Sequence, residues 1–326
     1  MILHLVLPGT ADGPLGVAVD VVATAARLVD AGLARPPARS LRQRVVSLDG
    51  RAVRSGLGRP IAVDGALPHR GLGRGDAVVI AGLSATTPAA VAALLARPDV
   101  ARVADRLPRL AARGVTIAAS CSATFVLGAA GLLAGRRATT TWWLAPELAR
   151  RFPTVELDAD RMVVDAGGVI TAGAALAHAD LMLALIARLG GPALAERVAR
   201  YLVLDARPAQ ARYLIVDHLR HADPAVRAVE RLVAGNLHRQ LGLAELARAA
   251  ATSPRTLARR FRAALGTTPL AFVQRARAAH AAHLLATTTA SVDDIAAQVG
   301  YADAAAFRRV FRRVLGASPR QARRLR

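Results

Sequence analysis

The sequence predicts an α/β domain built on a parallel sheet, followed by an all-helical domain. Short apolar runs alternate with helical patterns over residues 1–204, whereas residues 226–326 show helical patterns alone, after a weakly patterned linker at 205–225. The last hundred residues also contain an internal repeat. With 326 residues, 53% of them apolar, the chain is long enough for two domains with sizeable cores.

The first domain is expected to be a layered α/β structure, because apolar runs of four to six residues separated by helices are typical of buried parallel strands. Strands are predicted at 2–7, 44–48, 76–81 and 115–119, and helices at 15–28 and 124–133. The apolar stretch 169–187 contains His178 and Asp180, so it predicts a buried strand and helix instead of a membrane span. With no signal-like segment at the N-terminus, a cytoplasmic location is expected.

The second domain is expected to contain one helical unit twice. The copies span 243–269 and 292–319, and each has a short helix, a turn of small residues and a longer helix. Ser253 and Pro254 predict the start of the first longer helix, because serine caps helix N-termini and proline is tolerated at the first helical position.

Each longer helix combines an apolar stripe with an arginine-rich opposite face. The stripes, spaced by four residues, are Leu257, Phe261 and Leu265 in the first copy and Phe307, Phe311 and Leu315 in the second. A helix anchored by one face and carrying guanidinium groups on the other suits a DNA major groove, where arginine pairs with guanine or with phosphates. The competing interpretation is a solvated face in an arginine-rich chain.

Basic charge is concentrated in the second domain. All 44 basic residues are arginine, which is typical of GC-rich coding sequence and weakens the net charge of +21 as evidence for nucleic acid. Residues 227–326 nevertheless hold 18 arginines and five acidic residues, whereas the preceding 226 residues hold 26 arginines and 18 acidic residues. A segment with a net charge of +13 attracts phosphate polyanions.

Residues 226–326 resemble the AraC/XylS family of DNA-binding domains in the motifs SPRTLARRF, GTTP, RARAAHAAHLL, SVDDIAAQVGY and FRRVFRRVLGASP. The resemblance implies two helix-turn-helix units, joined by a helix at about 270–285, in successive major grooves of one duplex. It assigns DNA contacts to Arg255, Thr256, Arg259, Arg262, Arg308, Arg309 and Arg312. Three alanines, 304–306, begin the second long helix. The second helix-turn-helix unit is therefore expected to contact phosphates and to recognise the shape of the DNA, whereas the first is expected to supply more sequence preference.

Two positions depart from that family's pattern. Ala251 stands where glycine is frequent in the first turn, which predicts a strained or tightened turn, and Ala322 stands where tyrosine often follows the last proline.

The first domain contains a sharp junction in which a predicted strand runs through Ser120, Cys121 and Ser122 straight into a helix. Small residues, Ala119 and Ala123, stand two positions either side of the cysteine, as a nucleophile elbow requires. We expect the N-terminus of the following helix to lower the pKa of the Cys121 thiol.

This region resembles the DJ-1/PfpI class of the glutamine-amidotransferase-like superfamily, and in particular the sensor half of GlxA-type AraC regulators. The resemblance rests on DAVVIAGL, CSATFVLGAAGLLAGRRATT, RFPTVELDADRMVVDAGGVITAGAALAHADLMLAL and ERVARYLV. It implies a flavodoxin-like, class I glutamine-amidotransferase-like parallel sheet sandwich over 1–204, used for sensing and dimerisation.

The alternative function is a thiol-dependent amidase or deglycase-like enzyme with an accessory DNA-binding domain. Threonine stands before Trp142 where the superfamily's histidine is expected, and His178, the nearest candidate base, is expected to be packed or to cap its helix. We therefore expect no enzymatic activity and a Cys121 that is buried or lines a ligand, with a redox-sensitive or nucleophilic thiol as alternatives. A DNA-associated architectural or chaperone-like protein is a third hypothesis.

Ligands of α/β sheets bind at the carboxyl ends of the strands, which predicts a small-molecule pocket there. Its expected lining is Gly9, Gly82, Leu83, Cys121, Ser122, Thr141 and Trp142. The expected partners are operator DNA, a small-molecule effector and a second copy in a homodimer, with RNA polymerase as a candidate; effector binding would shift the geometry of the dimer. No cofactor or metal site is expected, because the single cysteine and eight histidines show no ligand spacing.

Overall fold

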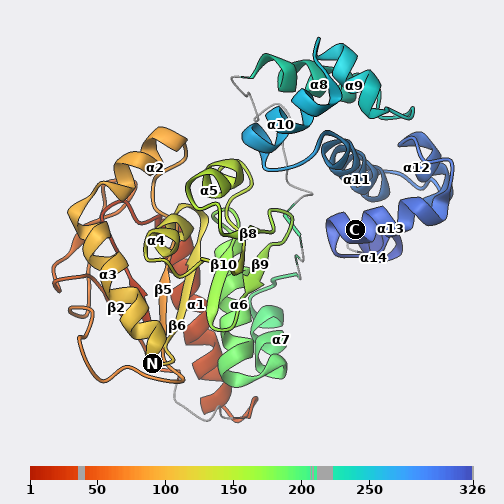
Figure 1. Cartoon of the computed structure of the whole chain (residues 1–326). Coiled ribbons are helices and arrows are strands. Elements are labelled where there is room, and N and C mark those ends of the chain that lie inside the picture. The colour runs from red at the N-terminus through yellow and green to blue at the C-terminus, as the bar shows by residue number, and fades with distance from the viewer. Residues whose placement is uncertain (36–40, 206, 208, 211–222, 325–326) are drawn as a thin grey trace. The chain divides into compact units, whose positions relative to one another are not determined.

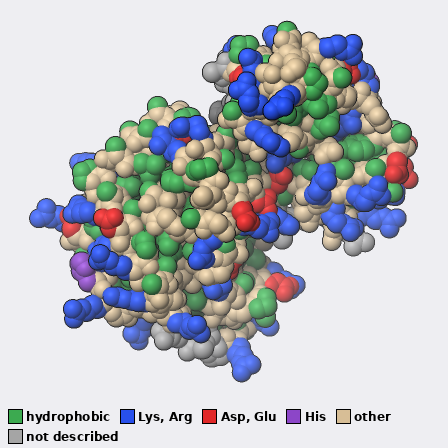
Figure 2. Space-filling model, viewed as in Figure 1, with side chains coloured by type: hydrophobic (Ala, Val, Ile, Leu, Met, Phe, Trp, Pro, Cys, Tyr) green, Lys and Arg blue, Asp and Glu red, His purple; other side chains and the backbone are tan. Residues whose placement is uncertain are grey.

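The computed structural model describes residues 1–35, 41–205, 207, 209–210 and 223–324. It divides into two compact units, Met1–Arg207 and Pro208–Arg326. Most of the linker predicted at 205–225 lies outside the described residues. On the visible surface of both units basic side chains outnumber acidic ones (Figure 2). None of the described helices is long and apolar enough to cross a membrane.

A six-stranded sheet is the centre of the first unit (Figure 1), and its strand order is β2-β1-β5-β6-β10-β9. Five strands pair in parallel: β1 (Ile2–Leu5), β2 (Gln43–Val46), β5 (Ala77–Ile80), β6 (Thr116–Ser120) and β10 (Val169–Ala172). The four strands predicted from apolar runs and the strand in 169–187 are all confirmed, with bounds that differ by up to two residues for the first four. The edge strand β9 (Val163–Asp165) is antiparallel and was not predicted.

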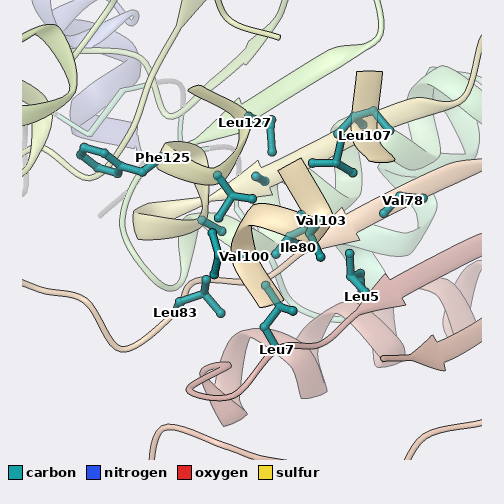
Figure 3. Close-up of a cluster of buried hydrophobic side chains, with 14 of the residues drawn as sticks. Leu5, Leu7, Val78, Ile80, Leu83, Val100, Val103, Leu107, Phe125 and Leu127 are labelled. Atoms are coloured by element: carbon teal, nitrogen blue, oxygen red, sulfur yellow. The ribbon is translucent and has the colours of Figure 1, made fainter. Parts of the chain in front are cut away.

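Helices cover both faces of this sheet (Figure 1). Strand side chains alternate between two cores, so that Val78 and Ile80 pack on one side and Ala77 and Val79 on the other. The first core is completed by α2 (Pro88–Leu95), α3 (Pro98–Ala112) and α4 (Thr124–Ala129), and the second by α1 (Asp12–Asp30), α6 (Ala177–Gly190) and α7 (Pro192–Tyr201). Figure 3 shows side chains of the first core meeting from strands and helices. The predicted α/β sandwich is confirmed.

Helix α4 ends four residues earlier than the predicted 124–133, and Gly131 then takes a left-handed φ of +72°. Short elements complete the unit: the paired β3 (Val53–Arg54) and β4 (Pro60–Ile61), the paired β7 (Arg137–Ala138) and β8 (Glu156–Leu157), and helix α5 (Ala145–Arg151).

Over residues 223–324 the second unit is helical. The helices are α8 (Pro224–Gly235), α9 (Leu243–Ala249), α10 (Pro254–Leu265), α11 (Pro269–Thr287), α12 (Val292–Gln298), α13 (Ala304–Leu315) and α14 (Pro319–Arg324). The joining helix predicted at about 270–285 is α11, and it contacts α8, α9 and α10 as well as α12, α13 and α14. This central helix therefore holds both halves of the unit.

Candidate functional site

The first half of the helical unit places a capped helix behind a short turn. The Ser253 hydroxyl accepts a hydrogen bond from the Thr256 amide at 3.2 Å, and Pro254 begins α10, as predicted. The same hydroxyl donates to the Thr256 hydroxyl at 3.0 Å, so Thr256 takes part in the cap.

One face of α10 is anchored and the other is free. Leu257, Phe261 and Leu265 are buried, and the Phe261 ring packs edge-on against Phe272 of α11 with centroids 5.7 Å apart. The opposite face exposes three arginines, none of which forms an ion pair or side-chain hydrogen bond with the described part of the chain; they are Arg255, Arg259 and Arg262. Three guanidinium groups that are available to bind a partner thus lie on one face of α10.

The second half repeats this geometry with different arginine partners. Asp303 caps α13 by accepting hydrogen bonds from the amides of Ala305 and Ala306 at 2.7 and 3.1 Å. Arg308 is exposed but forms an ion pair with Asp293, and Arg309 lies 3.9 Å from an Asp303 oxygen.

Arg312 is also exposed and has no ion pair or side-chain hydrogen bond within the described residues. The outer face of α13 is therefore partly neutralised by its own carboxylates, in contrast to α10. Figure 2 shows the clustered basic side chains on the visible surface of this unit.

The two turns before the long helices both need a left-handed residue. Ala251 has a φ of +48° and Gly300, at the matching position, has a φ of +80°. The strain predicted for the first turn is therefore present, because a side chain disfavours this conformation.

Arg277 of α11 connects the two halves, and sequence analysis missed this role. Its side chain is buried, its Nη2 donates to the Arg239 carbonyl oxygen at 2.5 Å, and its guanidinium carbon lies 5.4 Å from the centre of the Tyr301 ring. Arg239 follows α8 and Tyr301 follows α12, so one side chain links both halves. A signal was present in the spacing: Arg277 falls four residues after Val273 and four before Ala281, within the buried stripe of α11.

In the α/β unit, Cys121 occupies the predicted elbow between β6 and α4. Its φ of +55° is left-handed, which is unusual for a residue with a side chain. A Cβ atom added at Gly82 would lie only 3.0 Å from the Cys121 Cβ, so the two segments are in close contact. The hydroxyls of Thr124 and Thr140 both donate to the Cys121 carbonyl oxygen.

The expectation that the helix N-terminus lowers the pKa of the Cys121 thiol is wrong. Burial raises that pKa, because desolvation of the thiolate outweighs the hydrogen bonds from Ser122 and Thr141. Cys121 is only 8% exposed.

His178 is packed inside the unit, as expected. Its Nδ1 lies 2.8 Å from the Ser120 hydroxyl, and burial together with the nearby His4 lowers its pKa to about 3. The imidazole is therefore neutral, and its hydrogen bond goes to Ser120 and not to the thiol.

The seven residues predicted to line a pocket gather near the carboxyl ends of the strands, mostly as packed groups. The Ser122 hydroxyl accepts from the Leu83 amide at 3.0 Å and donates to the Leu83 carbonyl oxygen, and the Gly9 carbonyl oxygen accepts from the Ser84 amide at 2.9 Å. Thr141 is buried, and Trp142 is buried against Trp143 with ring centroids 5.2 Å apart. None of the seven lines the cavity of about 510 Å³ found at this edge of the sheet, which opens over β1 and β2.

No group of three histidine, cysteine or acidic side chains that could hold a metal ion occurs among the described residues.

Two protein-family models match the chain: that of the DJ-1/PfpI family at residues 17–188 and that of a helix-turn-helix domain at residues 246–325. The HTH-type transcriptional regulator GlxA of Rhizobium meliloti is 35% identical over 221 residues, 67% of this chain and 68% of that protein. The HTH-type transcriptional regulator CdhR of Pseudomonas aeruginosa is 33% identical over 291 residues, 86% of this chain and 81% of that protein.

A crystal structure of a Vibrio parahaemolyticus protein aligns with 62% of this chain and 97% of its own, at 17% identity and a TM-score of 0.51. That likeness supports the fold of the first unit.

Proposed function

The chain belongs to the AraC-type transcriptional regulators that carry a DJ-1/PfpI domain, and on this premise we propose that its two helix-turn-helix units bind neighbouring major grooves of one operator duplex. In the proposed domain arrangement, residues 1–204 sense and dimerise, 205–225 link, and 226–326 bind DNA. The observation that carries the DNA-binding mode is the exposed, unpaired arginine face of α10, opposite its buried Leu257, Phe261 and Leu265 stripe.

The proposed division of labour between the units follows from their arginine partners. Arg255, Arg259 and Arg262 need break no internal ion pair to reach bases or phosphates, whereas Arg308 must leave Asp293. Thr256 contributes from the first turn of α10, and Arg309 and Arg312 bind mainly phosphates from α13. The first helix-turn-helix unit therefore supplies most of the sequence preference.

The test is to select bound genomic fragments with the purified full chain and to footprint the enriched site at moderate salt. Arg259→Ala should then weaken operator binding by about 1–3 kcal/mol and relax base preference at one position. Arg197→Ala removes the same charge from an exposed position on α7 and is the matched control. Equal losses in both variants would reduce Arg259 to a general charge effect and overturn the contact assignment.

For the α/β unit at the start of the chain we propose a regulatory role without catalysis. The Cys121 thiol is buried with a raised pKa, and His178 is bonded to Ser120, so His178 does not activate the thiol. The proposed partners are a small-molecule effector, a second copy of the chain and RNA polymerase. Because its proposed target is operator DNA, the protein is proposed to act in the cytoplasm.

Alkylation of the native protein with iodoacetamide tests the absence of a nucleophile. Because the thiolate is the reacting form, Cys121 should react more slowly at pH 7.5 than an exposed thiol, and at full speed only after unfolding. Cys121→Ser gives the background of labelling. Rapid stoichiometric labelling below pH 7 would instead support the enzyme hypothesis.

A further inference from the structure

The cavity over β1 and β2 is separate from the elbow and has an arginine-rich rim. Its volume is about 510 Å³, within the range of small-molecule sites. Three segments form it: the carboxyl end of β1, the residues from the end of β2 to β3, and the start of α3. The lining residues are Val6, Leu7, Pro8, Ser47, Leu48, Asp49, Arg51, Ala52, Val53, Arg54, Arg97, Asp99 and Arg102.

The two carboxylates of this lining are already engaged. Asp99 forms a two-pronged ion pair with Arg97, whose Nε lies 3.0 Å from Asp99 Oδ1, and Arg97 Nη1 also donates to the Pro8 carbonyl oxygen at 2.8 Å. Asp49 accepts a hydrogen bond from the Arg51 amide at 3.1 Å. Asp99 is therefore neutralised by Arg97, whereas the exposed Asp49 keeps its charge, because the hydrogen bond from the Arg51 amide lowers its pKa.

The arginines of the lining form few ion pairs or hydrogen bonds with the described part of the chain. Arg51 and Arg102 are exposed, and their guanidinium groups have no ion pair or hydrogen bond within the described part of the chain. The charge of Arg51 does act on the nearby Asp49, where it helps to lower the pKa of the carboxyl. Arg54 donates one hydrogen bond, from Nη1 to the Gly58 carbonyl oxygen at 2.9 Å. With four arginines and two aspartates, the lining has a net charge of +2.

We infer that this cavity binds a small organic anion, a carboxylate attached to an apolar body. Arg51 and Arg102 are the groups that pair with the carboxylate, since a guanidinium offers two parallel donors to its two oxygens. The apolar body packs against Leu7, Leu48 and Val53 in the lining. The position agrees with the general placement of ligands outside the carboxyl ends of parallel strands.

The hairpin formed by β3 and β4 lies beside the cavity and connects it to the region of the Cys121 elbow. The Arg54 carbonyl oxygen accepts from the Gly9 amide at 2.8 Å, and the Gly56 amide donates to the Thr10 carbonyl oxygen at 2.9 Å. Thr10 in turn pairs with Leu83, the residue held by Ser122. The regulatory meaning of binding rests on the proposed function, with this anion as the effector, whereas binding itself does not depend on DNA.

The experiment is calorimetric titration of the full chain, without DNA, with phenylacetate and with its uncharged isostere phenylacetamide. Phenylacetate should bind saturably with one site per chain, and phenylacetamide at least tenfold more weakly. The double variant Arg51→Gln/Arg102→Gln should weaken phenylacetate binding at least tenfold. Arg74 is an exposed arginine that lines a second cavity, beside the amino ends of β5 and β6, and Arg74→Gln should leave binding unchanged.

Equal affinity for acid and amide, undiminished binding by the double variant, or no saturable binding would each overturn the inference. Unchanged thermal unfolding of the double variant shows that any loss comes from the site and not from misfolding. If the chain binds phenylacetate but not operator DNA, the proposed function fails and this site stands; the reverse result removes the site alone.

Discussion

Replacing Arg277 by methionine should uncouple the two helix-turn-helix units without removing a DNA contact. The substitution keeps most of the length of the side chain but removes its hydrogen bond to the Arg239 carbonyl oxygen and its contact with the Tyr301 ring. A buried hydrogen bond from a charged donor contributes roughly 1.5–3 kcal/mol, and the cation–π contact about 1 kcal/mol. We therefore expect the free energy of local unfolding of α11 and its neighbours to fall by about 2.5–4 kcal/mol.

Hydrogen–deuterium exchange, followed by mass spectrometry, measures this change locally. Peptides from α11 and α12 should lose protection, while peptides from the sheet of the first unit remain unchanged. Operator affinity should also fall, because the two units are no longer held in fixed register. Arg231→Met, an exposed position on α8, is the control and should change stability by less than about 0.5 kcal/mol. Unchanged exchange in α11 would refute the bridging role of Arg277.

Three further predictions concern two left-handed turn residues and one buried histidine. Gly300→Ala should cost roughly 2 kcal/mol or more in unfolding free energy, because its new Cβ would lie 2.7 Å from the Leu237 carbonyl oxygen in a left-handed backbone; wild-type stability would contradict this. Ala251→Gly should instead raise thermal stability by about 0.5–1 kcal/mol, by releasing the same strain, and a loss would show the turn to be relaxed. Since the pKa of His178 is about 3 when folded and 6.5 when unfolded, stability is lost as pH falls below 6.5, by about 2 kcal/mol between pH 7 and 5. His178→Gln should remove that part of the pH dependence, and an unchanged pH slope in urea unfolding would contradict it.

Much of the fold follows from local patterns. The apolar run at 76–81 could only be satisfied by burial on both faces, and the structure buries all four residues of β5. The spacing of Leu257, Phe261 and Leu265 fixes which face of α10 packs inward, and so leaves its arginines outside. Strands of two residues, such as β3, are too short to show any alternation.

The features that sequence analysis missed depend on packing between distant segments. The pKa of the Cys121 thiol was expected to fall because only the local helix N-terminus was considered, whereas burial under other segments decides it. Arg51 and Arg102 line the same cavity, and no local sequence pattern links positions so far apart in the chain. Arg277 was hidden among exposed arginines, because an arginine-rich chain gives little contrast between a buried guanidinium and a solvated one.

The most direct test of paired binding is a hydroxyl-radical footprint on the selected operator, combined with an insertion of five base pairs between the protected segments. Two helices in successive major grooves should protect two segments about 10 base pairs apart on one face of the duplex. The insertion turns one segment to the opposite face, so affinity should fall at least tenfold. A single protected segment, or full affinity after the insertion, would show that the two units do not bind the duplex together.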